Sequence, residues 1–155
     1  MLIVVFLQAH YASAQSWDSE GVEAEISNYY AEYLSAFSNQ DIDRIADNYF
    51  VPPINIRNGS ETLFFQTRSS VIDYFKSVFE NLSGESYARS ESMGTNICVL
   101  TDTTAIVSTG FRRFGSDGSI IFESAATYFL TKREGSWRFT NSSTHGVDRI
   151  ISCDD

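Results

Sequence analysis

The second half of the chain is a run of long strand-like segments with very short links, and this pattern constrains the fold most. The segments are rich in β-branched and aromatic residues. They cover residues 86–100, 103–115, 119–133 and 136–146. The links carry turn signals, which are Thr101-Asp102, Ser116-Asp117-Gly118 and Glu134-Gly135. Links this short force neighbouring strands to run antiparallel, so the sequence predicts a meander of four strands.

The first half of the chain predicts helices instead. An apolar stripe with three-to-four spacing follows Ser19 and is typical of an amphipathic helix. The stripe consists of Val22, Ile26, Tyr29, Tyr30, Tyr33, Leu34 and Phe37. A short second helix is expected after Asp41, and a third is expected from Ser69 or Ser70 to Leu82.

A hairpin is predicted between the second and third helices. Pro52-Pro53 stops helix formation, because proline lacks the amide donor. Residues 54–57 alternate apolar and polar side chains like a strand, and Asn58-Gly59 is a preferred type I′ turn pair. Because helices come first and strands last, the class is α+β. We predict a curved antiparallel sheet wrapped around three helices of the N-terminal half, which makes a cone-shaped α+β barrel.

Composition and charge exclude several kinds of partner. A chain of 155 residues with 43% hydrophobic residues suits one domain with a substantial core. The net charge of -9 makes nucleic acid and an anionic membrane surface unfavourable partners. The sequence contains no zinc-type cysteine spacing, HExxH motif, EF-hand loop or glycine-rich phosphate loop. It therefore predicts no metal and no cofactor.

The N-terminus has the composition of a secretory signal peptide. Residues 2–7 are apolar, and Ala12-Ser13-Ala14 has the small-x-small form of a signal-peptidase site. We expect a signal peptide at residues 1–14, a mature protein that is secreted or periplasmic, and no membrane segment in that form. No basic residue precedes the apolar run, so a buried first strand or a start codon placed too late are alternatives, and the protein would then be cytoplasmic.

The two cysteines leave two interpretations open. Cys98 and Cys153 are compatible with one disulfide in an oxidising compartment. Cys98 also lies in an apolar run, where a cysteine is more often a small buried hydrophobe. Cys153 falls in residues 147–155, which we expect to be a C-terminal tail after a domain at residues 20–146.

The order of elements resembles the nuclear transport factor 2-like (NTF2-like) superfamily, which includes SnoaL-like cyclases and ketosteroid isomerases. The resemblance is carried by "YYAEYLSAF", "DIDRIADNYF", "VPPINIRNGSETLFF", "SSVIDYFKSVF" and "GSWRFTNSSTH", and "YFVPP" with its hairpin looks most like an uncharacterised bacterial branch. It covers residues 20–146. It implies a sheet folded around a pocket and a homodimer through the outer face of the sheet. Apolar strand residues fit such a dimer, since one side alone cannot bury them all: Phe111, Phe114, Ile120 and Phe122.

Steroid isomerases of this fold need a carboxylate base at the end of the strand after the second helix and a second acid opposite it. Here the first position falls in Ile54-Asn55-Ile56-Arg57, and the second in residues 124–130, and neither contains an acid. This argues against isomerase chemistry by that mechanism. Asn55 and Arg57 would instead hold a polar or anionic group if they face the pocket.

His145 is the candidate general acid or base. Period-two alternation places Trp137, Phe139, Asn141, Ser143 and His145 on one face of the last strand. If Trp137 and Phe139 point into the cone, Asn141 and His145 continue that face toward its mouth. The alternative is that His145 is a hydrogen-bonded residue at a strand end.

Other polar groups have a similar double interpretation. Tyr30 and Tyr33 would donate hydroxyl groups into the pocket, or simply belong to the core. Arg112-Arg113 puts one guanidinium on each face of the sheet, so one of them would point inward.

Three functions fit these residues. The first is a small-molecule-binding domain with a hydrophobic pocket and no catalytic acid pair. The second is a SnoaL-like isomerase, cyclase or dehydratase acting on a hydrophobic carbonyl compound, with His145 as acid or base. The third is a protein-interaction or dimerisation module. The sequence does not decide whether the protein is an enzyme.

Overall fold

The structure is a computed structural model that describes residues 18–153, so the predicted signal peptide lies outside the described residues. The helical elements are α1 (Ser19–Ser38), α2 (Ile42–Arg44), the π-helical turn η1 (Ile45–Tyr49), α3 (Arg68–Ser83) and the 3₁₀ turn η2 (Val147–Arg149). The strands are β1 (Ile54–Asn58), β2 (Glu61–Phe65), β3 (Tyr87–Thr101), β4 (Thr104–Gly115), β5 (Ile120–Arg133) and β6 (Ser136–His145). Among the described residues, no helix is long and apolar enough to span a membrane.

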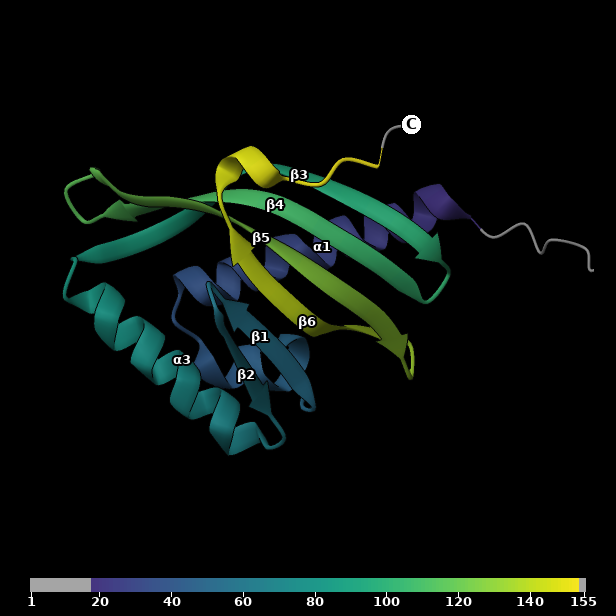
Figure 1. Ribbon diagram of the computed structural model, residues 1–155, viewed down its shortest axis with the longest axis horizontal. Coiled ribbons are helices and arrows are strands. Elements are labelled where there is room, and N and C mark those ends of the chain that lie inside the picture. Colours follow the sequence, from purple (N-terminus) through teal and green to yellow (C-terminus); the bar gives the residue numbers. More distant parts are fainter. Residues whose placement is uncertain (1–17, 154–155) are drawn as a thin grey trace, which may run out of the picture.

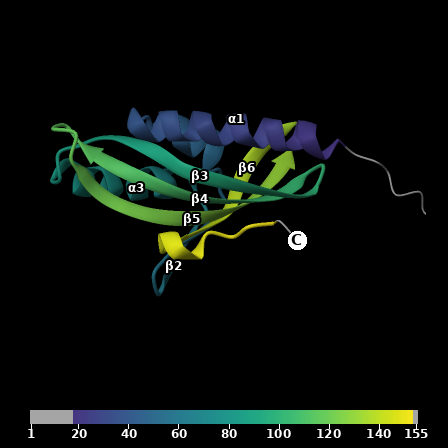
Figure 2. The ribbon, with the colours of Figure 1, turned by 90° about the horizontal axis from the view of Figure 1, so that it is seen from above.

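The strands form one curved six-stranded sheet in the order β2-β1-β6-β5-β4-β3 (Figure 1). β3 to β6 make the predicted antiparallel meander, and β1 and β2 make the predicted hairpin. Figure 2 shows α1 along one face of the long strands, which we call the inner face, and the C-terminal segment on the outer face. The predicted α+β class, with a curved sheet around helices, is confirmed. Two details differ: β1 runs parallel to β6, and the sheet stays open at β2 and β3.

Side-chain caps set the helix starts. The Asp18 carboxylate accepts a hydrogen bond from the Gly21 amide at 3.0 Å, so α1 begins at Ser19 rather than after it. A capping box of Thr67 and Ser70 starts α3 at Arg68. Both helices therefore begin within two residues of the predicted starts.

The hairpin turn differs from the predicted one by one residue. Asn58 pairs with Glu61, so the two-residue loop is Gly59-Ser60 rather than Asn58-Gly59. Gly59 has a φ of 60° at the first central position, which fits a type II′ turn. Asn58 therefore stays in the strand, where its Oδ1 accepts a hydrogen bond from the Thr144 hydroxyl at 3.0 Å.

Aromatic rings fill the space between α1 and the inner face. The Tyr33 ring lies 5.2 Å from the Phe139 ring and 6.0 Å from the Tyr128 ring, measured between centroids. Tyr128 and Phe139 stack at 4.5 Å across neighbouring strands. Such pairs contribute about 0.5–1.5 kcal/mol each beyond the burial of their area. The predicted stripe of the first helix is thus the side of α1 that packs on the sheet.

A β-bulge changes the alternation of β6. Phe139 pairs with Leu130, but Asn141 pairs with Phe129, so Thr140 is an extra residue in β6. Because an extra residue reverses the faces beyond it, the side chains after Thr140 alternate in the opposite sense. Ser142 therefore lies beside the inward Tyr128 and is buried.

Residues 147–153, the described part of the expected C-terminal tail, lie as a strap on the outer face of the sheet (Figure 2). The Ile151 amide donates to Ser108 Oγ at 2.9 Å, and Asn96 Nδ2 donates to the Ile151 carbonyl at 2.9 Å. Cys98 and Cys153 form a disulfide with a Cα–Cα distance of 5.6 Å, so of the two interpretations the disulfide is the one present. A dimer through the outer face stays a prediction, and a second copy would share that face with the strap.

Candidate ligand-binding site

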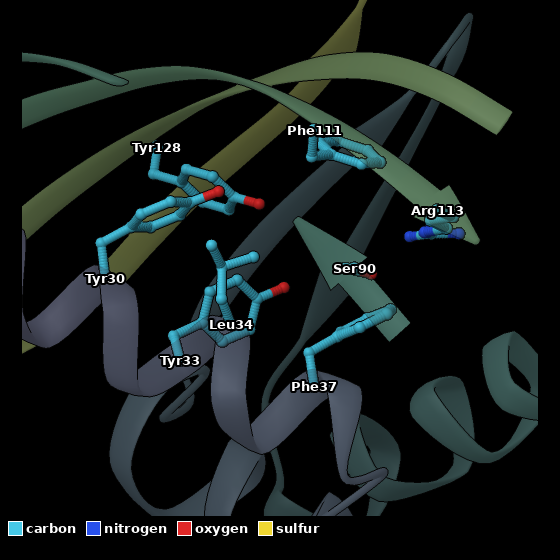
Figure 3. A pocket seen from close by; sticks show the side chains of 8 residues that line it. All are labelled: Tyr30, Tyr33, Leu34, Phe37, Ser90, Phe111, Arg113 and Tyr128. Atoms are coloured by element: carbon cyan, nitrogen blue, oxygen red, sulfur yellow. The ribbon is translucent and has the colours of Figure 1, made fainter. Parts of the chain in front are cut away.

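Three neighbouring pockets on the inner face of the sheet, beside α1 and α3, share part of their lining, and we call them together the cavity. Its inner part is lined by Tyr30, Tyr33, Leu34, Phe37, Ser90, Phe111, Arg113 and Tyr128 (Figure 3). The middle part, of about 70 Å³, adds apolar side chains of α3 and hydroxyls of β6, among them Tyr74, Phe75, Val78, Ser142 and Thr144. The mouth, of about 210 Å³, adds Asn58, Phe122 and Ser124. Phe111 and Arg113 line all three parts, so these two residues lie beside each part of the cavity.

Strand β4 brings Phe111 and Arg113 to the cavity by simple alternation. Side chains two residues apart on a strand share a face, so both point inward while Arg112 points outward. Arg112 forms an ion pair with Glu123 on the outer face. The prediction of one guanidinium on each face is therefore confirmed, and Arg113 is the inward one. Phe111 and Phe122 also line the cavity, so they are not part of an outer dimer face.

Arg113 is held by aromatic rings instead of by a carboxylate. Its guanidinium carbon lies 5.0 Å from the Phe37 ring centroid, 5.2 Å from that of Phe111 and 5.6 Å from that of Phe122. Cation–π contacts of this kind are worth about 0.5–2 kcal/mol. Within residues 18–153 no carboxylate lies at ion-pair distance from Arg113. Its Nε is buried and has no hydrogen-bond partner.

Tyrosine hydroxyl groups lie on the same side of the inner cavity. Figure 3 shows the hydroxyls of Tyr30, Tyr33 and Tyr128 pointing toward the side where Arg113 lies. Burial raises the pKa of all three hydroxyls far above the ordinary range, and the charge of Arg113 offsets this only in small part for Tyr33 and Tyr128. The three groups are therefore neutral donors at physiological pH. The Tyr30 hydroxyl is buried without a hydrogen-bond partner within residues 18–153, although the Thr109 hydroxyl lies close enough to lower its pKa in part.

The cavity contains no group suited to proton transfer at neutral pH. None of the residues that line its three parts is an aspartate, a glutamate or a histidine. Among residues 18–153, no three His, Cys, Asp or Glu side chains are placed to hold a metal ion. The cavity can bury apolar surface, donate hydrogen bonds and present one positive charge.

His145 is not in this cavity, and the expectation that it shares a face with Trp137 and Phe139 is wrong. The bulge at Thr140 turns His145 and Asn141 to the outer face, opposite Ala125 and Phe129. His145 Nδ1 lies 3.0 Å from the Gly146 carbonyl, which can only accept, so Nδ1 is the donor in this hydrogen bond. Its Nε2 forms a hydrogen bond of 2.8 Å with the Thr127 hydroxyl.

Asn55 and Arg57 also lie outside the cavity. Ile54 and Ile56 are buried in the core, so the residues between and after them face the other way. Asn55 pairs with Asn141 across the parallel strands, and Arg57 Nε donates to the Gly59 carbonyl at 3.4 Å. Asn55 and Asn141 are therefore neighbours in the strand register, but on the outer face.

Tyr30 and Tyr33 are the predicted site residues that do line the cavity, and their role in binding stays a prediction. Tyr128, Ser142 and Thr144 were not among the predicted site residues, and the sequence left open which of Arg112 and Arg113 points inward. Alternation along β4 and β5 could have predicted that Arg113 and Tyr128 point inward. No pattern in the sequence predicts that Ser142 and Thr144 point inward, because no residue type marks the bulge that turns them.

Comparisons with known proteins agree with this architecture. The family model described as NTF2-like protein (DUF6841) matches residues 23–147. No curated protein matches the chain. The structure of Aln2 from a Streptomyces species is similar with a TM-score of 0.68 at 14% identity, covering 86% of this chain and 96% of that one.

Two further structures have the same fold. An NTF2-like protein with a cystatin-like fold from Novosphingobium aromaticivorans gives a TM-score of 0.67 at 14% identity, covering 85% of this chain and 86% of that one. An NTF-2 like protein of unknown function from Shewanella oneidensis gives 0.65 at 11% identity, covering 79% and 97%. At such identities the likeness concerns the fold alone.

Proposed function

The chain belongs to the NTF2-like protein family DUF6841, and we propose that its domain binds a small, mainly apolar molecule in the cavity between α1 and the sheet. The observation that carries this proposal is the lining of that cavity. Aromatic side chains make up most of it, hydroxyl groups supply donors, and acidic and histidine side chains are missing from it. Binding sites for small molecules commonly have this composition, with few polar groups in an apolar wall.

The same lining favours binding over catalysis by an acid–base pair. A general base must reach the proton that it removes, and His145 instead bonds to Thr127 on the outer face. The tyrosine hydroxyls are too weakly acidic to act as bases at neutral pH, because burial raises their pKa values. The enzyme alternative with His145 as acid or base therefore has no geometric support.

Thermal-shift measurements with small aromatic compounds test the proposal. Indole, naphthalene and 2-naphthamide are suitable probes, because each is flat and neutral. A ligand present at 100 times its Kd stabilises the folded protein by about 2.7 kcal/mol, which is a clear rise in Tm. If no probe raises the Tm, binding in this cavity is contradicted.

A pair of variants on α3 locates the binding. Val78 lines the middle and the mouth of the cavity, whereas Lys76 on the same helix is exposed to solvent. Val78→Trp is expected to fill the cavity and to weaken probe binding more than tenfold. Lys76→Trp adds the same ring at the surface and is expected to leave binding unchanged. Equal binding by both variants would place the ligand elsewhere.

A further inference from the structure

We infer that the molecule bound in the cavity is a monoanion, an aromatic or other apolar carboxylic acid, and that its carboxylate pairs with Arg113. This inference rests on the proposed function and narrows its ligand class. It starts from a difference among the arginines of the chain. Five of them have a carboxylate partner: Arg44, Arg68, Arg89, Arg112 and Arg149. Arg57, Arg113, Arg133 and Arg138 have none within residues 18–153, and of these four only Arg113 has a buried nitrogen without a hydrogen-bond partner.

An unpaired guanidinium in such a place is costly. Taking a charged group out of water costs several kcal/mol unless ion pairs or hydrogen bonds replace the lost hydration. The rings of Phe37, Phe111 and Phe122 offset part of this cost, but they leave the Nε–H without an acceptor. A carboxylate bound in the cavity would supply that acceptor and the opposite charge together.

The number of positive charges in the cavity determines which kind of anion fits it. Arg113 is the only arginine, lysine or histidine among the residues lining the three parts of the cavity. One guanidinium matches one carboxylate, whose two oxygens fit the planar fork of N–H groups. A phosphate monoester carries nearly two charges at neutral pH and would need further cations or backbone donors. The site therefore suits a carboxylate better than a phosphate.

The surroundings of Arg113 also indicate the rest of the ligand. Phe111 accompanies Arg113 in every part of the cavity, and the mouth adds Phe122, which is 45% exposed. A flat apolar body beside the carboxylate would cover these rings and exclude water from the ion pair. In such a dry site the charge–charge attraction is stronger than at the surface.

Two compounds with the same ring system test the charge separately from the apolar body. 2-Naphthoate carries a carboxylate, and 2-naphthamide is its neutral counterpart. Calorimetric titration of the wild-type protein is expected to give a Kd for naphthoate that is about 10- to 100-fold lower than the Kd for naphthamide. The reason is that a charge-assisted hydrogen bond with Arg113 stabilises only the naphthoate complex. Arg113→Met is expected to abolish this preference, while Arg112→Met, the neighbour on the outer face, should keep it.

The outcomes separate the two proposals. Equal binding of both compounds to the wild-type protein would overturn the carboxylate inference and leave the proposed apolar binding standing. If neither compound nor any neutral probe binds, the proposed function fails as well. Circular dichroism checks that Arg113→Met folds. If it does not, Arg113→Lys keeps the positive charge but loses the planar fork, and it should lower the preference for naphthoate several-fold; an unchanged preference would contradict the role of Arg113.

Discussion

The two faces of the long strands differ in how some of their polar groups are paired. On the outer face, Ser108, Thr127 and His145 form a hydrogen-bonded chain that ends at the amide of Ile151 and the carbonyl of Gly146. On the inner face, Arg113 Nε and the Tyr30 hydroxyl are buried without partners. Buried polar groups that are fully paired support the structure, whereas buried groups left unpaired are costly. The hydrogen-bonded chain on the outer face therefore supports the fold, and the unpaired groups on the inner face are the ones that the proposed ligand would pair.

The largest effect is expected from phenylalanines on the two faces. Phe139 is fully buried among the rings of Tyr33, Phe50 and Tyr128, whereas Phe129 is 45% exposed on the outer face. Phe139→Ala should lower the free energy of unfolding by about 3–5 kcal/mol, because it removes a large ring and leaves a hole. Phe129→Ala should cost below about 1 kcal/mol. Urea denaturation measures both, and equal losses would refute the division into core and surface faces.

The disulfide should have the next largest effect. It links Cys98 to Cys153 across a sequence separation of 55 residues. Closing a loop of that length restricts the unfolded chain by about 4 kcal/mol in the chain-entropy model. The double variant Cys98→Ser/Cys153→Ser is therefore expected to unfold at lower urea concentration, by about 2–4 kcal/mol.

Hydrogen exchange then shows whether the strap is held by more than the disulfide. In the double variant the amide of Ile151 should exchange faster, because the disulfide no longer holds the segment that forms the hydrogen bond to Ser108. Protection equal to that of the wild-type protein would mean that the hydrogen bonds alone hold the strap.

The smallest effect on stability is expected from two threonines of β5. They allow a direct comparison of a hydrogen-bonded hydroxyl group with an unpaired one. Thr127 bonds to both Ser108 and His145, whereas Thr131 Oγ1 is buried with no partner. Thr127→Val should cost about 1–3 kcal/mol, because it leaves two polar groups unsatisfied. Thr131→Val should be neutral or slightly stabilising, because it removes an unsatisfied one. Thermal unfolding of both variants gives the sign, and destabilisation by Thr131→Val would show a partner for that hydroxyl.

Local periodicity predicted the elements of this fold but not the direction of every side chain. The apolar stripe of α1 and the short turns of the meander depend on nearby residues alone, so the sequence contains their signals. The faces of β6 depend on a single inserted residue, Thr140, which resembles any other strand residue. That one insertion moves Asn141 and His145 away from the cavity and brings Ser142 and Thr144 to it.

The candidate site was predicted only in part for a related reason. Tyr30 and Tyr33 follow from helix spacing, which holds over the whole length of α1. That Arg113 has no carboxylate partner depends instead on which residues its own strand and two other elements, α1 and β5, bring near it. No local pattern predicts that rings from α1 and β5 join Phe111 around it while no acid of residues 18–153 lies at ion-pair distance.

The disulfide also affects how the protein would respond to a protease. The segment between Cys98 and Cys153 contains β4, β5 and β6, which include Phe111, Arg113 and Tyr128 of the cavity wall. Its turn at Asp117-Gly118 is exposed and is a natural place for cleavage. A cut there would leave the two fragments joined by the disulfide, so the wall of the cavity would stay together. On a gel the fragments would separate only after reduction.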